Sequence, residues 1–117
     1  MRFVQPNYRL RAFATTNDPL LSQQFGVADA GAGGISATAA WNTTIGSSKI
    51  VIGVLDSGLD LDHPDLVANL WTNRTGIKGC GYGTHGYNAI TGSCNPNDDG
   101  GHGTHVGGIA AARGNNG

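Results

Sequence analysis

The chain has 117 residues, a net charge of −1, 20 glycines and two cysteines. This length suits one small domain or part of a larger one, and the near-neutral charge without a basic stripe argues against a nucleic-acid partner. No apolar run approaches the roughly 18 residues of a membrane span, and residues 1–19 lack the apolar centre of a signal peptide. The protein is therefore either cytosolic or begins upstream of these residues.

The region before residue 49 is predicted to hold little regular structure. Residues 20–25 favour a short helical turn after the turn signal Asn-Asp-Pro. The alanines of residues 35–45 predict a helix. In that helix we expect Ile35, Ala39 and Trp41 to face inward.

The stretch KIVIGVLDSG, residues 49–58, predicts a buried β-strand. Ile50 to Leu55 form a nearly unbroken apolar run rich in β-branched residues, which is typical of a strand covered on both faces in a parallel sheet. Asp56 follows at the carboxyl end of this strand, the edge where open parallel sheets bind ligands. The order of strand, loop and helix predicts an α/β fold with a parallel sheet.

The rest of the chain is predicted to be loop followed by one helix. HPDL, residues 63–66, predicts a turn because Pro64 restricts its own φ angle. Residues 72–101 are mostly loop, with a candidate short strand at residues 86–90. The helix is expected to begin near His102 and to run through Ala112.

Two cysteines, Cys80 and Cys94, flank a stretch rich in Gly, Asn and Thr. They either form a disulfide or remain reduced thiols in a cytosolic loop. A disulfide would close a loop of about 15 residues and contribute on the order of 3 kcal/mol. We favour the disulfide, because this loop has little apolar packing to order it.

The stretch GGHGTHVGGIAAAR, residues 100–113, places His102 at the amino end of the predicted helix. The helix dipole there disfavours a positive charge, so we expect a lowered His102 pKa and a neutral, basic imidazole near pH 7. Glycines on both sides leave the ring accessible and allow close packing. Gly107 and Gly108 would let the helix press against another element in the same way.

Three interpretations of the histidines are open from spacing alone. In the plainest, His102 and His105 are loop and core residues without chemistry. In the second they belong to a metal site, although no HExxH or Cys-x-x-Cys motif is present. Its candidate ligands are His102, His105, His85, Cys80, Cys94 and Asp56. In the third, an acid–base relay from Asp56 to His102 activates a nucleophile.

Two segments, VIGVLDSGLDLDHPDL at 51–66 and GGHGTHVGGIAAA at 100–112, resemble the aspartate and histidine segments of the subtilisin-like serine peptidases, the subtilases. They match in residues, order and separation. The resemblance implies an α/β parallel-sheet subtilisin-like fold, of which only the N-terminal portion is present, and hydrolysis of peptide bonds by an Asp-His-Ser triad. It implies that Asp56 is the triad acid and that His102 acts as general base and then general acid. His105 would be non-catalytic and would pack within the helix region.

The family's nucleophile, in a G-T-S-M-A-like segment, and its oxyanion asparagine lie far downstream of the histidine segment and have no match here. None of the serines stands in such a context: Ser22, Ser36, Ser47, Ser48, Ser57 and Ser93. We therefore expect a serine endopeptidase fragment that is inactive alone and lacks most of the sheet that should cover its strand. The alternatives are a catalytically dead binding or structural module and a zinc-dependent hydrolase.

The N-terminal residues carry a second part of the resemblance. RFVQPNYRLRA, residues 2–12, is similar to the last strand of an inhibitory propeptide, and NDPLLSQQFGV, residues 17–27, to the start of a mature subtilase. This implies a propeptide remnant over 1–14 and the N-terminal part of the peptidase domain over 15–117. The implied partners are the protein's own propeptide and a peptide or protein substrate, with no nucleic acid and no membrane. The implied location is extracellular, although this chain shows no signal peptide.

The resemblance further implies a structural calcium ion and no organic cofactor. Calcium takes six to eight oxygen ligands from carboxylates, carbonyls and amides. The matching positions are the carboxylates of Asp18 and Asp65, the Arg113 carbonyl and the Asn116 side chain. Asp98 and Asp99 are candidates for a second site, although acidic surface loops are usually only solvated.

Two tripeptides match the acceptor pattern for N-glycosylation. They begin at Asn42 and at Asn73. The pattern is short and is weak support for modification by itself.

Overall fold

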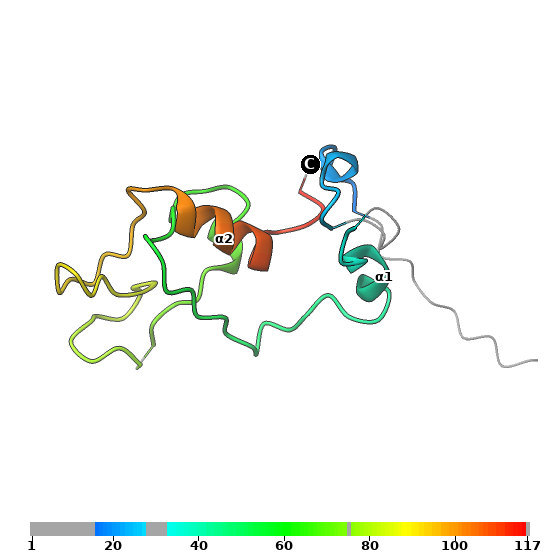
Figure 1. Cartoon of the computed structure of the whole chain (residues 1–117). Coiled ribbons are helices and arrows are strands. Elements are labelled where there is room, and N and C mark those ends of the chain that lie inside the picture. Colours follow the sequence, from blue (N-terminus) through cyan, green and yellow to red (C-terminus); the bar gives the residue numbers. More distant parts are fainter. Residues whose placement is uncertain (1–15, 28–32, 75, 117) are drawn as a thin grey trace, which may run out of the picture. The chain divides into compact units, whose positions relative to one another are not determined.

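Figure 1 shows the computed structural model of the chain, which describes residues 16–27, 33–74 and 76–116. These residues divide into two units, one ending at Gly46 and the other comprising Ser47–Asn116. The predicted propeptide remnant, residues 1–14, lies outside the described residues. In the described part of the chain, no helix has the length and apolar content needed to span a bilayer.

The first unit contains two short helices. The 3-10 helix η1, Leu21–Gln23, agrees with the helical turn predicted for residues 20–25. Helix α1, Ala37–Trp41, is shorter than the predicted helix, since its N-cap Ser36 is left-handed with φ 55° and makes no side-chain capping bond. Ile35 and Ala39 are exposed, so the prediction that they face inward is wrong.

The buried strand predicted over residues 50–55 is not formed. Its apolar side chains are exposed, by 39% at Val54 and by 97% at Leu55. A strand covered on both faces needs ladder partners beside it and other elements over it. The described residues contain no neighbouring strand, and a single parallel bridge joins Leu59 to Asn97. The parallel sheet of the predicted fold is therefore not confirmed in this chain.

A disulfide joins Cys80 to Cys94 within the long loop of the second unit, with the Cα atoms 5.5 Å apart. The predicted bridge is thus present. The candidate strand at residues 86–90 is reduced to one antiparallel bridge between Asn88 and Ser93. The loop is held by its covalent link and its turns rather than by a β-ladder.

The side chain of Asn73 is hydrogen-bonded to several backbone groups of this loop, and Asn73 is only 2% exposed. Its side-chain nitrogen donates hydrogen bonds to the carbonyl oxygens of Cys80 and Gly81, at 3.2 and 3.1 Å. Its side-chain oxygen accepts from the backbone N–H groups of Gly76 and Ile77. A glycan on this nitrogen would have no room, so the glycosylation pattern at Asn73 does not mark a modification site in this fold.

The turn predicted at residues 63–66 is present, with the Leu66 N–H donating to the His63 carbonyl at 2.9 Å. It leads into the 3-10 helix η3, Val67–Asn69. The side-chain amide at the end of η3 donates to the carbonyl of Ala111 at 2.9 Å. In Figure 1 this green segment accordingly runs beside the orange and red helix α2.

Helix α2, His102–Ala111, begins where predicted and ends one residue earlier. Gly103 and Gly107 are buried along it, and a Cβ atom on Gly107 would lie 2.6 Å from the side chain of Leu59. The close packing expected of these glycines is therefore confirmed. Gly108 has open space around it, so the same expectation is wrong at that position.

Candidate active site

The structure brings together Asp56 and His102, which are 46 residues apart in the sequence. The His102 Nδ1 atom lies 2.8 Å from Asp56 Oδ1 and 2.9 Å from Asp56 Oδ2. The aspartate side chain is 20% exposed, whereas the imidazole is 73% exposed. The aspartate side chain is thus more covered than the ring, which is open to solvent.

The surroundings of Asp56 keep its carboxylate ionised. The Ser57 backbone N–H donates to Oδ1 at 2.7 Å. This hydrogen bond, and then the one from His102, hold the Asp56 pKa below its ordinary value. An ionised carboxylate only accepts hydrogen bonds, so the proton between the two residues lies on His102 Nδ1. The neutral ring therefore has its lone pair at Nε2, an atom without a hydrogen bond to any described residue.

The pKa of His102 is raised, not lowered as its place at a helix amino end suggested. The hydrogen bond that His102 donates to Asp56 is the largest cause, followed by the charge of Asp56, while desolvation acts in the opposite direction. The charge of Asp98 adds a further small increase. The nearby carboxylates therefore raise the His102 pKa, and the expected direction was wrong.

The hydroxyl of Ser57 links the turn after Asp56 to helix α2. It accepts a hydrogen bond from the Gly103 N–H at 2.9 Å. It donates to Asp98 Oδ1, also at 2.9 Å. The Ser57 hydroxyl thus donates one hydrogen bond and accepts another, and both bonds hold the backbone around Asp56 and His102.

Asp98 is a functional candidate whose role the sequence did not reveal. Its carboxylate accepts hydrogen bonds from the serine hydroxyl just described and from the loop and first turn that lead into α2. The side-chain hydrogen bond from Thr104 is the largest cause of an Asp98 pKa far below the ordinary range. The available signal was an aspartate four residues before the histidine, close to the amino end of the predicted helix, where a negative charge is favourable.

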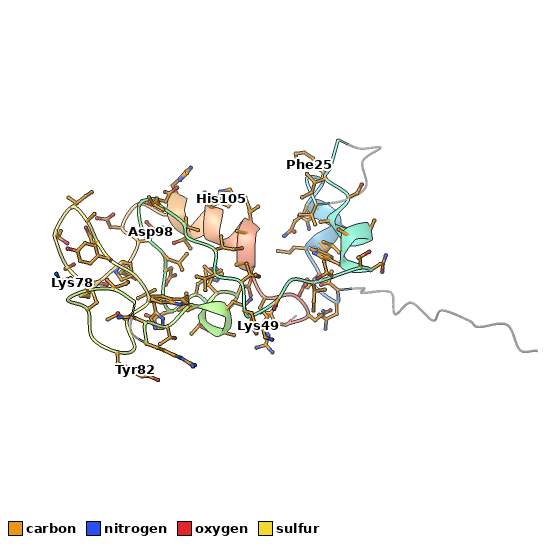
Figure 2. All side chains as sticks on the ribbon, turned by 90° about the horizontal axis from the view of Figure 1, so that it is seen from below. Phe25, Lys49, Lys78, Tyr82, Asp98 and His105 are labelled. Atoms are coloured by element: carbon orange, nitrogen blue, oxygen red, sulfur yellow. A yellow bond between two sulfur atoms is a disulfide. The ribbon has the colours of Figure 1, made fainter. Side chains whose placement is uncertain are left out.

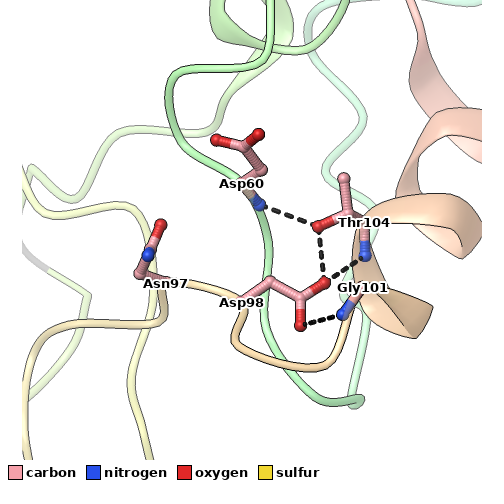
Figure 3. A pocket seen from close by; sticks show the side chains of 5 residues that line it. All are labelled: Asp60, Asn97, Asp98, Gly101 and Thr104. Atoms are coloured by element: carbon pink, nitrogen blue, oxygen red, sulfur yellow. Dashed lines mark hydrogen bonds between the residues drawn. The ribbon is translucent and has the colours of Figure 1, made fainter.

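An open pocket of about 400 Å³ lies beside this carboxylate (Figure 3). Five residues line it: Asp60, Asn97, Asp98, Gly101 and Thr104. It borders the junction between the loop and α2 and does not include the imidazole of His102. The Asp98 carboxylate in this pocket is engaged by hydrogen bonds, so it is not the merely solvated surface acid that its loop suggested.

The zinc site considered from the sequence is not assembled. Cys80 and Cys94 are joined in a disulfide and cannot act as thiolate ligands. His85 Nδ1 contacts the Trp71 carbonyl at 2.9 Å. His105 is exposed on α2 (Figure 2), which corrects the expectation that it packs within the helix region. Among the described residues, no three His, Cys, Asp or Glu side chains are placed to share a metal ion.

Part of the predicted calcium ligand set lies together in the second unit. The Asn116 side-chain amide donates to Asp65 Oδ1 at 2.7 Å, and the Arg113 N–H donates to the Asp65 carbonyl at 2.8 Å. Asp18 belongs to the first unit, where its N–H donates to the Thr16 hydroxyl oxygen at 3.1 Å. Carboxylate and amide oxygens suit a hard cation, so the donor chemistry of Asp65 and Asn116 fits calcium, and the ion stays a prediction.

Comparisons with known proteins identify relatives of this chain. The family model described as the subtilase family matches residues 47–117. Halolysin from Haloferax mediterranei is 32% identical over 115 residues, which cover 95% of this chain and 19% of the relative. A thermophilic serine proteinase from Bacillus sp. (strain AK1) is 36% identical over 117 residues, covering 99% of this chain and 25% of that protein.

A halolysin-like extracellular serine protease Nep from Natrialba magadii is 29% identical over 125 residues. That match covers 99% of this chain and 20% of Nep. The chain therefore spans about a fifth to a quarter of the length of the curated relatives it matches.

Proposed function

The chain belongs to the subtilase family, and from this premise we propose that it supplies the acid and the general base of a serine endopeptidase. Asp56 orients the imidazole and stabilises its charged form, and His102 Nε2 is the proton-accepting atom. The serine nucleophile would come from a segment outside the present residues. The intact protein would act on peptide or protein substrates.

The contact between Asp56 and His102 is the observation that carries this proposal. Two carboxylate oxygens within 2.9 Å of Nδ1 restrain the ring and select the tautomer with a free Nε2. A raised His102 pKa makes the ring a stronger base toward a hydroxyl proton. The exposure of the ring leaves Nε2 open to a nucleophile and a substrate.

The proposed reaction uses this arrangement in the following steps. The serine oxygen attacks the scissile carbonyl carbon while His102 Nε2 takes the hydroxyl proton, and a tetrahedral intermediate forms. The imidazolium then gives that proton to the leaving amine as the C–N bond breaks, which leaves an acyl ester on the serine. Water then attacks the ester carbonyl as the same ring takes its proton, and the ring gives that proton to the serine oxygen as the ester C–O bond breaks and the acid product leaves. Asp56 stays ionised throughout.

The remaining parts of the proposal rest on the family resemblance. The protein would be secreted, which the word "extracellular" in the name of the Nep relative supports. Its own propeptide, including residues 1–14, would be an intramolecular partner before maturation. Peptide substrates would bind in an extended form.

A fluorophosphonate probe, which reacts with activated serines, tests the catalytic proposal. We expect the intact protein containing these residues to be labelled, and the isolated 117-residue chain not to be. His102→Ala should abolish labelling, and Asp56→Asn should slow turnover by roughly 10⁴-fold. His105→Ala, a change on the same helix, is the matched control and should label normally. An intact protein that binds peptides but is never labelled would instead be a binding module.

We also propose that calcium stabilises the second unit through oxygen atoms of Asp65, Asn116 and Arg113. Binding to the folded state should raise the thermal midpoint by an amount that grows with the logarithm of calcium concentration. Asp65→Asn should remove this dependence. Asp62→Asn, at an exposed acid in the same loop, should retain it. A thermal midpoint that does not change with calcium would contradict the proposed ion, without affecting the proposed peptidase chemistry.

A further inference from the structure

We propose that Asp98 is a positioning residue for the pair formed by Asp56 and His102, and that it acts through Ser57 and the first turn of α2. This inference rests on the proposed function. Asp98 does not touch the imidazole through a hydrogen bond. Its contacts run instead to the backbone segments that carry the two catalytic candidates.

Both oxygen atoms of the Asp98 carboxylate accept hydrogen bonds. Oδ1 accepts from the Ser57 hydroxyl and from the N–H groups of Gly100 and Gly101, each at 2.9 Å. Oδ2 accepts from the Thr104 N–H at 2.9 Å and from its hydroxyl at 2.5 Å. Figure 3 shows the carboxylate turned toward Gly101 and Thr104 at the start of the helix. Charge-assisted hydrogen bonds of this kind are stronger than neutral ones.

Helix α2 has no capping side chain at its N-cap position, and the hydrogen bonds to Asp98 take the place of that cap. The N-cap residue is Gly101, which has φ 83° and no side chain to accept from the first turn. The carboxylate of Asp98 accepts from that residue and from Thr104 at the third helical position. It also places a negative charge at the positive end of the helix dipole. The start of α2, and with it the backbone of His102, is thereby fixed.

The same carboxylate is also hydrogen-bonded to the residue that follows Asp56. Ser57 follows Asp56 directly, and its hydroxyl bridges Asp98 Oδ1 and the Gly103 N–H. A second connection runs through the Thr104 hydroxyl, which accepts from the Asp60 N–H at 2.9 Å. The segment that follows Asp56 is therefore tied, through Asp98 and Thr104, to the helix that begins at His102.

A direct electrostatic effect of Asp98 on His102 must be separated from positioning. Asp99 offers a matched control, because it is the adjacent acid, is exposed and makes no hydrogen bond to the described residues. Asp99→Asn removes a charge at the neighbouring position, but the charge of Asp98 also raises the His102 pKa directly, so the Nδ1 proton signal is the readout that separates positioning from charge. Only Asp98→Asn leaves a Thr104 donor without a carboxylate acceptor.

The test is NMR titration of the 117-residue chain, following the His102 ring and its hydrogen-bonded Nδ1 proton. We expect Asp98→Asn to broaden or remove the Nδ1 proton signal, whereas Asp99→Asn leaves that signal in place. In the intact protein, Asp98→Asn should lower kcat by about 100-fold through misalignment of the pair, with KM little changed. An Asp98→Asn chain with the wild-type Nδ1 signal, or an equal loss of that signal in Asp99→Asn, overturns the inference.

Ser57→Ala is the second variant, and it decides the matter if Asp98→Asn does not fold. It removes the bridge but leaves the bonds from Asp98 to the helix. A fall in the His102 pKa supports the inference, and an unchanged titration contradicts it. If the wild-type chain itself shows no Nδ1 proton signal, the proposed pairing fails before Asp98 is considered. The two failures are therefore distinguishable.

Discussion

Gly103 of helix α2 lies against Gly58 in the turn after Asp56. A Cβ atom on Gly103 would be 2.1 Å from the Gly58 carbonyl oxygen and 3.1 Å from the Cβ of Asp56. Because the obstacle is backbone, a change of side-chain rotamer cannot relieve it. The helix that carries His102 can approach the acid only because the next residue has no side chain.

Gly103→Ala should therefore separate the helix from the turn. We expect it to lower the free energy of unfolding by about 3 kcal/mol, the upper part of the usual range for overpacking, and to lower the His102 pKa as the contact with Asp56 is lost. Gly108→Ala is the control, since open space surrounds that helical glycine. It should raise stability by about 0.5–1 kcal/mol. Urea unfolding and His102 titration measure both effects, and equal stability of the two variants would contradict the packing argument.

The raised pKa of His102 predicts the pH dependence of stability. A group whose pKa is higher in the folded state stabilises the fold fully below its unfolded value of about 6.5. That contribution is lost as the pH rises through the folded value. Asp56→Asn should lower the His102 pKa toward its ordinary value and remove this dependence, as measured by urea unfolding between about pH 5 and 9. A variant that keeps the wild-type titration would show that Asp56 is not the cause.

The lowered pKa values of Asp56 and Asp98 predict resistance to acid. Their stabilising effect is present above the unfolded carboxyl value of about 3.9 and is lost only as the pH falls through the lower folded values. The contribution of Asp98 should persist to the lowest pH, because its pKa is far below the ordinary range. Circular dichroism during acid titration should place the unfolding of Asp98→Asn at higher pH than that of the wild type. Unfolding at the same pH would contradict the hydrogen bonds assigned to Asp98.

Loss of the disulfide between Cys80 and Cys94 should loosen the long loop. The chain-entropy relation for a loop of about 15 residues gives a loss of about 3 kcal/mol on reduction. The double substitution of both cysteines by serine should show a similar loss without any reductant. Thiol titration of the untreated, denatured chain should detect no free thiol. Two reactive thiols there would contradict the bridge.

Asn73 should matter more to stability than its polar character suggests. Asn73→Ala leaves the carbonyls of Cys80 and Gly81 and two N–H groups without their partner. We expect a loss of about 3 kcal/mol, at the upper end of the range for buried groups left unsatisfied. Asn97→Ala is the matched control, because that side chain is exposed and makes no hydrogen bond to the described residues. Thermal unfolding of the two variants compares them, and similar losses would refute the role given to Asn73.

Several features follow from local sequence because their causes lie within a few residues. The turn at 63–66 follows from Pro64, and the helix that begins at His102 follows from alanines bounded by glycine and asparagine. The two catalytic candidates were found from short motifs, and the disulfide from two cysteines flanking a loop with little apolar packing. In each case the residues that determine the feature are neighbours or belong to a recognisable family pattern.

Other features depend on contacts between distant segments. The apolar run at 50–55 was predicted to be buried, but burial requires neighbouring strands that the described residues do not contain. The shift of the His102 pKa was predicted in the wrong direction because the local sequence shows only the helix, while the carboxylate that raises the pKa lies 46 residues away in the chain. The role of Asp98 was missed because its hydrogen bond to Ser57 spans 41 residues.

By itself, then, the sequence determined the kind of chemistry, through an aspartate at the end of an apolar run and a histidine opening a glycine-flanked helix. Only the tertiary structure decided the protonation, orientation and support of these groups. The physical reason is that hydrogen bonding and charge act over a few ångströms in space, and the folded chain alone brings Asp56, His102 and Asp98 within that range.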